Sequence, residues 1–178
     1  MHPRQRELLE NAHRGQCRTW ATMILVPFFY LVLGHWLGPK LQELQVERFL
    51  SMALLRGFFY LLALAAIAYA WHLRRATVNG HLPRLIRSIA PRMARSSSPE
   101  APVAAIVYHS ATVICLGIAE SIALLGLILH LFGDSVYLLY FFANAAAAAM
   151  IFFRPQLGDM EKMARQFATE EASSSAPG

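Results

Sequence analysis

Long apolar stretches separated by short polar segments make up most of the chain. Four of them are long enough to cross about 30 Å of hydrocarbon at about 1.5 Å per helical residue, and they cover residues 19–38, 49–71, 103–132 and 135–153. The sequence GDS between the last two allows only a tight turn, so these two spans form an antiparallel hairpin. The pattern predicts an all-α fold, a bundle of four transmembrane helices, with two packed antiparallel hairpins as one arrangement of it.

Arginines and lysines gather on one side of the predicted spans. Thirteen lie in the N-terminal segment 1–18, the loop 72–102 and the C-terminal tail 154–178, whereas the short loop after the first span holds two, Lys40 and Arg48. Cytoplasmic loops of membrane proteins carry an excess of Lys and Arg. We therefore expect a multi-pass protein of the inner (plasma) membrane, with both termini and the loop 72–102 in the cytoplasm.

The composition narrows the class of protein and its partners. The chain of 178 residues is 56% hydrophobic and 15% charged, which favours a membrane protein over a soluble one. Its net charge of +5 sits mainly at the predicted membrane edges, where the basic loop would attract anionic lipid of the bilayer. No Phe, Tyr or Trp lies between Arg74 and Arg95, so we expect no nucleic acid as a partner.

Motifs of catalysis and metal binding do not stand out in the sequence. We find no serine, histidine and acid arrangement and no phosphate-binding glycine loop, which disfavours an enzyme. The two cysteines, Cys17 and Cys115, are far apart and indicate neither a metal site nor a disulfide framework.

Polar residues inside the spans are the best candidates for function, because a charged group at the membrane centre costs about 2.5–3.5 kcal/mol even on a lenient scale. Glu120 and Asn144 lie near the centres of the third and fourth spans, and Arg56 lies within the second. Such groups face the bundle interior and one another. We therefore predict a cluster of Glu120, Arg56 and Asn144, with His109, eleven residues before Glu120 on the same helical face, at the inner entrance of a proton path.

Two roles for this cluster stay open. In the first, Glu120 alternates between protonated and ionised forms as protons or ions cross the membrane. In the second, Arg56 pairs with Glu120, Asn144 donates to the carboxylate, and the cluster fixes helix packing in a structural or assembly subunit. The two roles make opposite demands on Arg56, because a permanent cation beside Glu120 would hold it ionised.

The sequence around Glu120 adds a resemblance. The run ARSSSPEAP, followed by LGIAESIALLGLIL, resembles the loop and carboxylate helix of the proteolipid (c) subunit of rotary ATP synthases, over about residues 94–132. The carboxylate helix of that family also runs from the cytoplasmic loop outward. The resemblance implies that Glu120 corresponds to the ion-binding carboxylate, and it favours proton or ion translocation, by this chain or by a complex that contains it.

Histidines offer a less favoured alternative, a haem-binding membrane cytochrome. His35 and His130 lie at the outer ends of the first and third spans, and His72 and His109 lie at the inner ends of the second and third. Two such pairs resemble bis-histidine haem ligation. However, His109 and His130 are 21 residues apart, about 31 Å along a helix, so both lie at the membrane interfaces. We therefore expect no cofactor.

Small residues in the last two spans permit close helix contact. Span four contains the run Ala145 to Ala149, and span three contains Gly117 and Gly126. Faces of small residues let membrane helices approach each other closely. They fit packing within the hairpin, a homo-oligomer or a larger membrane complex, and the sequence leaves these alternatives open.

Overall fold

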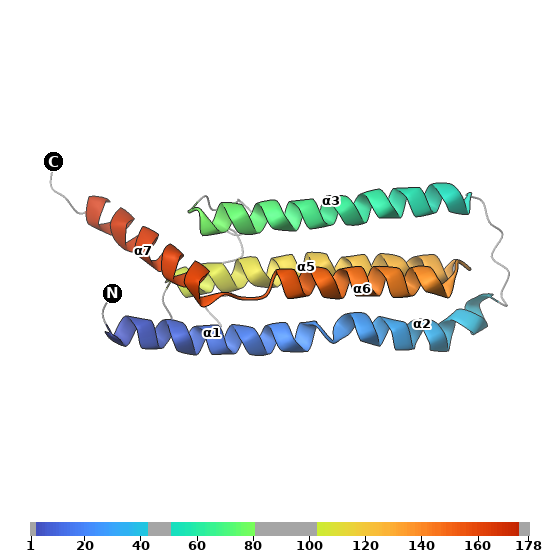
Figure 1. The fold of residues 1–178 in the computed structure, drawn as a ribbon, viewed down its shortest axis with the longest axis horizontal. Coiled ribbons are helices and arrows are strands. Elements are labelled where there is room, and N and C mark those ends of the chain that lie inside the picture. The colour runs from blue at the N-terminus through green and yellow to red at the C-terminus, as the bar shows by residue number, and fades with distance from the viewer. Residues whose placement is uncertain (1–2, 43–50, 81–102, 175–178) are drawn as a thin grey trace. The chain divides into compact units, whose positions relative to one another are not determined.

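The computed structural model describes residues 3–42, 51–80 and 103–174, and within these ranges the secondary structure consists of helices without a strand (Figure 1). The prediction of an all-α fold is therefore confirmed. The predicted basic loop lies largely outside the described residues, from residue 81 to 102. The helices are α1 (Pro3–Met23), α2 (Val26–Gln42), α3 (Met52–Val78), α5 (Val103–Leu131), α6 (Val136–Phe152) and α7 (Leu157–Ser174).

Three helical segments are long and apolar enough to cross a membrane. They are Arg6–Lys40, which joins α1 and α2, then Met52–Val78 and Val103–Leu131. A fourth crossing is complete only if α6 and the first part of α7 count together, and these two helices meet at a bend of 51°. The helices α2, α3, α5 and α6 coincide with the apolar stretches that the sequence pattern indicates, which marks the chain as a membrane protein.

A short break separates α1 from α2 directly before Pro27. The backbone N–H of Leu25 donates to the carbonyl of Thr22, and the N–H groups of Phe28 and Phe29 both donate to Leu25. Pro27 has no N–H to donate and its ring crowds the preceding turn, which interrupts a helix at this kind of position. Pro27 therefore accounts for the break between α1 and α2.

The described residues divide into two structural units, and the first consists of residues 1–20, 71–114 and 154–178. In this unit α7 packs through Met160 and Met163, which are both fully buried. Arg74 of α3 donates to the Asp159 carboxylate at 3.0 Å and to the Arg154 carbonyl at 3.2 Å. These contacts hold the start of α7 against the end of α3.

The second unit consists of residues 21–70 and 115–153, and it holds a core of small and apolar side chains. Close approach of α5 and α6 depends on Gly126, because a Cβ added there would lie 2.5 Å from the Cβ of Phe142. Two glycines one turn apart on α2, Gly34 and Gly38, allow a similar approach to Leu139 and His130. The buried core residues are Ala63, Ile122, Ala123, Leu129, Phe142 and Ala146.

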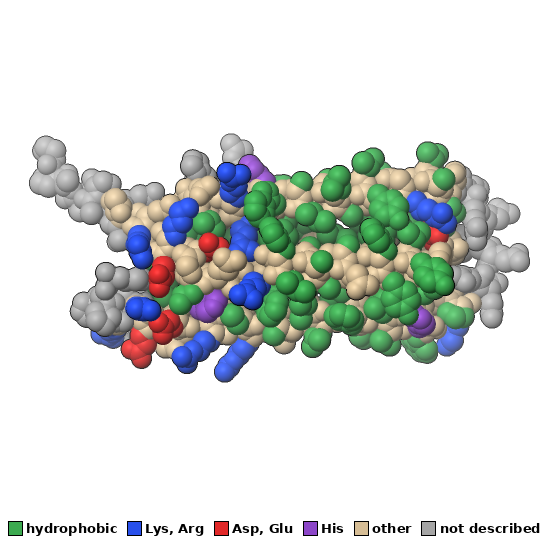
Figure 2. Space-filling view, viewed as in Figure 1, with side chains coloured by type: hydrophobic (Ala, Val, Ile, Leu, Met, Phe, Trp, Pro, Cys, Tyr) green, Lys and Arg blue, Asp and Glu red, His purple; other side chains and the backbone are tan. Residues whose placement is uncertain are grey.

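Large apolar side chains cover much of the outer surface of the second unit. On α3, Leu54, Leu61 and Leu64 are about two-thirds exposed, and hydrophobic side chains gather over α2 and α3 in Figure 2. A surface of this kind is rare on soluble monomers and marks contact with another apolar phase. In a chain with spans of this length, that phase is the hydrocarbon of the bilayer.

Candidate functional site

Glu120 accepts a hydrogen bond from a tyrosine of a different span. The side chain lies on α5 and is partly buried. Its Oε1 atom accepts a hydrogen bond from the Tyr30 hydroxyl of α2 at a distance of 2.8 Å. Among the residues that the structure describes, no Lys or Arg forms an ion pair with it. The carboxylate therefore has a neutral hydrogen-bond donor beside it instead of the expected cation.

Arg56 pairs with Asp134 and not with Glu120, so the predicted pairing is wrong. Its Nε donates to Oδ2 and its Nη2 donates to Oδ1, each over 2.6 Å, which makes a bidentate pair. The reason is the position of Arg56 in α3, only four residues after the helix begins at Met52. A long cationic side chain so near a helix end extends toward the membrane edge rather than toward the midplane.

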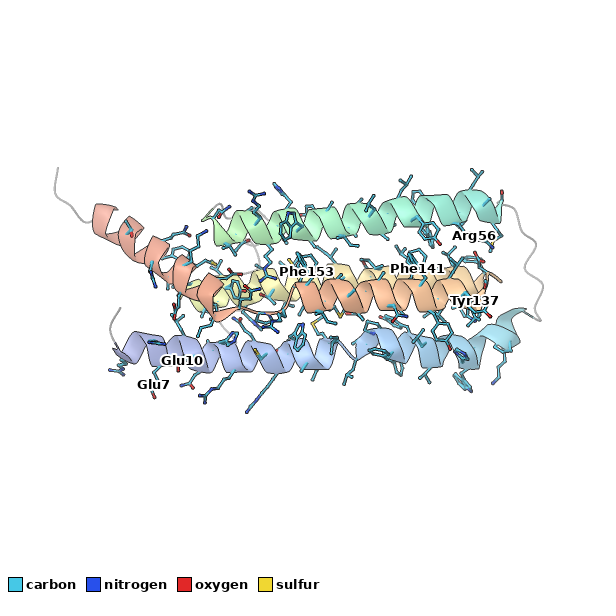
Figure 3. The ribbon with its side chains drawn as sticks, viewed as in Figure 1. Glu7, Glu10, Arg56, Tyr137, Phe141 and Phe153 are labelled. Carbon is cyan, nitrogen blue, oxygen red and sulfur yellow. The ribbon has the colours of Figure 1, made fainter. Side chains whose placement is uncertain are left out.

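Asp134 is the centre of a polar network at the turn between α5 and α6. Its side chain is fully buried, and Oδ1 also accepts from the backbone N–H of Ser135 over 2.6 Å. The Nδ1 atom of His130 lies 3.1 Å from the Asp134 carbonyl, and because a carbonyl only accepts, Nδ1 carries the proton. Every polar atom of Asp134 thus has a defined partner. Arg56 is labelled beside this turn in Figure 3.

Asn144 does not join the predicted cluster either. Its side chain is exposed on α6, and its Nδ2 donates to the Tyr140 carbonyl of the same helix over 2.8 Å. The amide therefore points to the outer surface of its unit. The helical period explains this result, because the residues one position to either side, Ala143 and Ala145, turn inward instead.

His109 lies in the first structural unit, whereas Glu120 lies in the second. His109 is partly buried, and its Nδ1 has no hydrogen-bond partner among the described residues. In the same unit Gln16 of α1 is almost fully buried and donates to the Ala105 carbonyl over 3.3 Å. The sequence analysis missed Gln16, since nothing in the polar N-terminal segment indicates which of its residues is buried.

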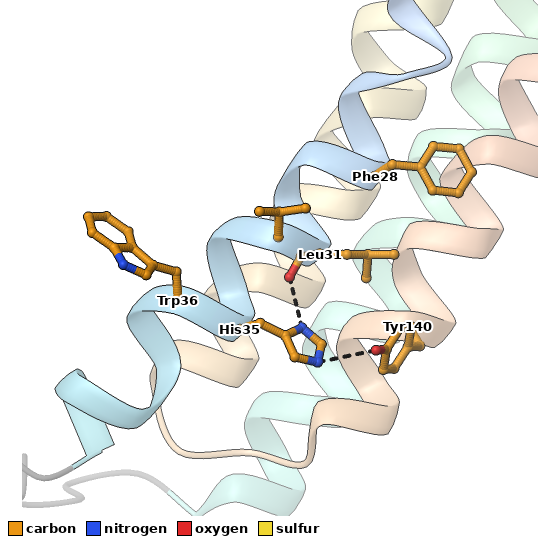
Figure 4. Close-up of a pocket in the computed structure, with 6 residues that line it drawn as sticks. Phe28, Leu31, His35, Trp36 and Tyr140 are labelled. Carbon is orange, nitrogen blue, oxygen red and sulfur yellow. Dashed lines mark hydrogen bonds between the residues drawn. The ribbon is translucent and has the colours of Figure 1, made fainter.

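An open groove of about 650 Å³ lies between α2 and α6 (Figure 4). One polar pair interrupts its apolar wall, because the Tyr140 hydroxyl lies 3.2 Å from Nε2 of His35. Because a carbonyl only accepts, Nδ1 of His35 donates to the Leu31 carbonyl at a distance of 2.9 Å. The lining residues are Phe28, Leu31, Val32, His35, Trp36 and Tyr140.

The histidines considered for haem ligation have other surroundings. His35 is bonded to Leu31 and Tyr140, His130 contacts Asp134, and His72 is exposed on α3. Within the described ranges, no three His, Cys, Asp or Glu side chains lie close enough together to hold a metal ion. The sulfur of Cys17 lies 3.6 Å from Nε2 of His13 in the same helix.

Comparisons with protein-family models, with curated proteins and with solved structures found no match to this chain. Its chemistry is therefore argued from the site alone. A carboxylate with one neutral donor can gain or lose a proton without breaking an ion pair, whereas a carboxylate held by a guanidinium cannot. Within the second unit, Glu120 is a carboxylate of the first kind and Asp134 is one of the second kind.

Tyr30 is the functional candidate that the sequence analysis missed. It lies near the centre of the first predicted span, at a depth similar to that of Glu120 in the third. That agreement in depth is the signal that could have indicated the contact. Tyrosine is common near membrane interfaces, so a tyrosine near the middle of a predicted span is easy to overlook.

Proposed function

We propose that this chain is a four-span protein of the inner membrane, with both termini in the cytoplasm, and that it moves protons or another small cation through Glu120. It would do so alone, as a homo-oligomer, or as a subunit of a larger complex. The apolar helices and the asymmetry of Lys and Arg support the topology. Anionic lipid beside the basic loop would be a further partner.

The observation that carries this proposal is the contact between Tyr30 and Glu120. A phenol donates to a carboxylate when the carboxylate is ionised, and it can accept from the carboxyl group when that group is protonated. The Tyr30 hydroxyl, 2.8 Å from Oε1 of Glu120, can therefore form a hydrogen bond with either state of the carboxyl group. Translocation requires a carboxylate that is stable in both states, and the resemblance to the proteolipid subunit implies the same role for Glu120.

A second candidate is a structural or assembly subunit, in which the polar contacts only hold helices together. Tyr30 and Glu120 join α2 to α5, and Arg56 and Asp134 join α3 to the turn after α5. Polar contacts between helices in lipid contribute about 0.6–2 kcal/mol each. The two candidates differ in what the loss of Glu120 removes, which is ion flux in the first and stability in the second.

Proton flux into liposomes separates the candidates. The purified chain is reconstituted with a pH-sensitive dye inside the vesicles, and a potassium diffusion potential drives uptake. We expect flux in the wild type, loss of at least about tenfold in Glu120→Gln, and unchanged flux in the control Glu7→Gln, whose carboxylate is exposed on α1. Equal flux in wild type and Glu120→Gln, at any level, contradicts translocation through Glu120 by this chain. A lower stability of Glu120→Gln in detergent with equal flux supports the packing role.

A further inference from the structure

The exposed face of α6 carries a regular seam of five residues. They follow spacings of four, three, four and three residues along the helix, which is the repeat of a left-handed helix pair. Tyr137 is 80% exposed, and Phe141 and Ile151 are each 55% exposed; Tyr137 and Phe141 are labelled on α6 in Figure 3. The α6 seam consists of Tyr137, Phe141, Asn144, Ala148 and Ile151.

Asn144 lies at the middle of the α6 seam and of the helix itself. Seven residues lie between Asn144 and Val136 at one end of α6, and seven lie between Asn144 and Phe152 at the other. One amide N–H is bonded to the Tyr140 carbonyl. Within the described part of the chain, no further hydrogen bond reaches the second N–H or the carbonyl oxygen of this amide. Lipid chains offer no donor or acceptor, so an exposed amide at this depth favours contact with another helix.

The chemistry of the α6 seam favours a second copy of this chain over an unrelated partner. An amide is both donor and acceptor, so Asn144 of one copy matches Asn144 of another without any other polar group. Two copies inserted in the same direction bring the same seam residues together about a twofold axis along the membrane normal. Ala148, one turn after Asn144, leaves room for the close approach that the hydrogen bond requires.

We propose that the chain forms a parallel homodimer through the α6 seam, with the two Asn144 amides hydrogen-bonded across the twofold axis. This inference does not depend on the role of Glu120, which lies on α5. The other four seam residues contribute van der Waals packing between the two helices. The amide pair sets the register of the two helices, as a single buried Asn does in soluble coiled coils.

Single-molecule photobleaching in lipid bilayers tests the strength of the proposed dimer. We expect the wild type to dimerise as its density in the bilayer rises, and Asn144→Leu to raise the dissociation constant by about 3- to 30-fold, the range for losing polar contacts between membrane helices. Asn144→Gln keeps an amide and should restore most of the affinity. The matched control is Ser121→Ala, since Ser121 is also exposed and bonded within its own helix, to the Ile118 carbonyl.

The proposal is overturned if the wild type stays monomeric at every density, or if Asn144→Leu dimerises as tightly as the wild type. Disulfide cross-linking in membranes supplies an independent readout that does not alter Asn144. In a chain that carries Cys17→Ser and Cys115→Ala, we expect Ala148→Cys to cross-link between copies and Ala65→Cys, exposed at the centre of α3, not to do so. Cross-linking through Ala65→Cys alone would assign the interface to α3 and contradict the α6 seam.

Discussion

Glu120 and Asp134 are two carboxylates of one structural unit, fourteen residues apart in sequence, and they differ in burial and in the charge of the side chain that donates to them. Asp134 is fully buried and held by two short bonds from Arg56 and one from the Ser135 amide. Glu120 is partly buried and accepts from the neutral hydroxyl of Tyr30. The contrast is between a carboxylate held in an ion pair and a carboxylate whose donor is a neutral hydroxyl.

The contrast also explains how one small unit can contain both kinds of group. Arg56, the cation that the second role placed beside Glu120, is bound at the turn between α5 and α6, so the ion pair does not reach the middle of α5. Desolvation offsets much of the attraction within a buried ion pair, whereas removal of one partner leaves an uncompensated charge. We infer that Arg56 and Asp134 specify how α3 meets the hairpin.

The largest effect on stability is expected from Asp134→Asn, which breaks the ion pair with Arg56. The substitution removes the charge that faces Arg56 and turns one acceptor oxygen into a donor directed at the guanidinium. We expect the free energy of unfolding to fall by up to about 3 kcal/mol, the upper end of the range for lost hydrogen bonds to a charged group, because Asp134 is buried while Arg56 is partly exposed. An SDS titration in detergent micelles measures this change.

The control for that variant is Glu161→Gln, which removes the partly buried carboxylate of a surface pair with the exposed Arg165 at 3.7 Å. Exposed pairs contribute about 0–1 kcal/mol, so this change should be small. If Asp134→Asn were no more destabilising than Glu161→Gln, Asp134 would not be the structural carboxylate that we describe.

A smaller effect is expected from Gly126→Ala, which changes the helix contact that lies between the two carboxylates. The new methyl group would lie 2.5 Å from the Cβ of Phe142, an atom close to the backbone, so α5 and α6 must move apart. Overpacking of this kind costs about 1–3 kcal/mol. Unfolding in the same titration measures the loss.

Gly117→Ala on the same helix is its matched control, because no atom lies within 4 Å of the added Cβ. The gain in helix propensity should leave that variant as stable as the wild type or up to about 1 kcal/mol more stable. Equal destabilisation by both substitutions would mean that α5 and α6 are not in close contact at Gly126.

The smallest effect on stability is expected from Tyr30→Phe, which removes the hydroxyl that donates to Glu120. The variant loses one hydrogen bond between helices, which corresponds to about 1 kcal/mol in the free energy of unfolding. Since Glu120 keeps its carboxylate, proton flux in liposomes should fall by less than in Glu120→Gln. A loss of flux in Tyr30→Phe as complete as in Glu120→Gln would assign the essential group to Tyr30 as well.

The sequence predicted the helical class and the limits of the last two apolar helices, because both follow from local properties. Apolar length indicated α5 and α6 to within a few residues of their observed bounds. By contrast, α2 begins seven residues after the start of the first predicted span, and α3 ends seven residues after the end of the second. Helix length also predicted that Glu120 lies well inside its helix. These features depend on hydrogen bonding within one segment and on the thickness of the bilayer, and neither requires knowledge of neighbouring helices.

The partners of the polar side chains could not be predicted in the same way. Arg56 was expected at Glu120 because both lie within spans, yet a flexible side chain reaches Asp134 in a turn that the sequence pattern indicated only as a connection. Asn144 was expected to face inward, but one residue of rotation about α6 decides between the core and the surface. Such outcomes depend on the rotation and depth of each helix relative to the others.

The most direct test of the account is the site of modification by dicyclohexylcarbodiimide, an apolar reagent that reacts with protonated carboxyl groups within membranes. The chain is treated in bilayers at mildly acidic pH, and peptide mass spectrometry compares the initial rates at the two carboxylates. We predict that Glu120 is modified and that Asp134, held by Arg56, is not. Modification of Asp134 at an equal or higher rate, or an unreactive Glu120, would contradict the assignment of Glu120 as the available carboxylate.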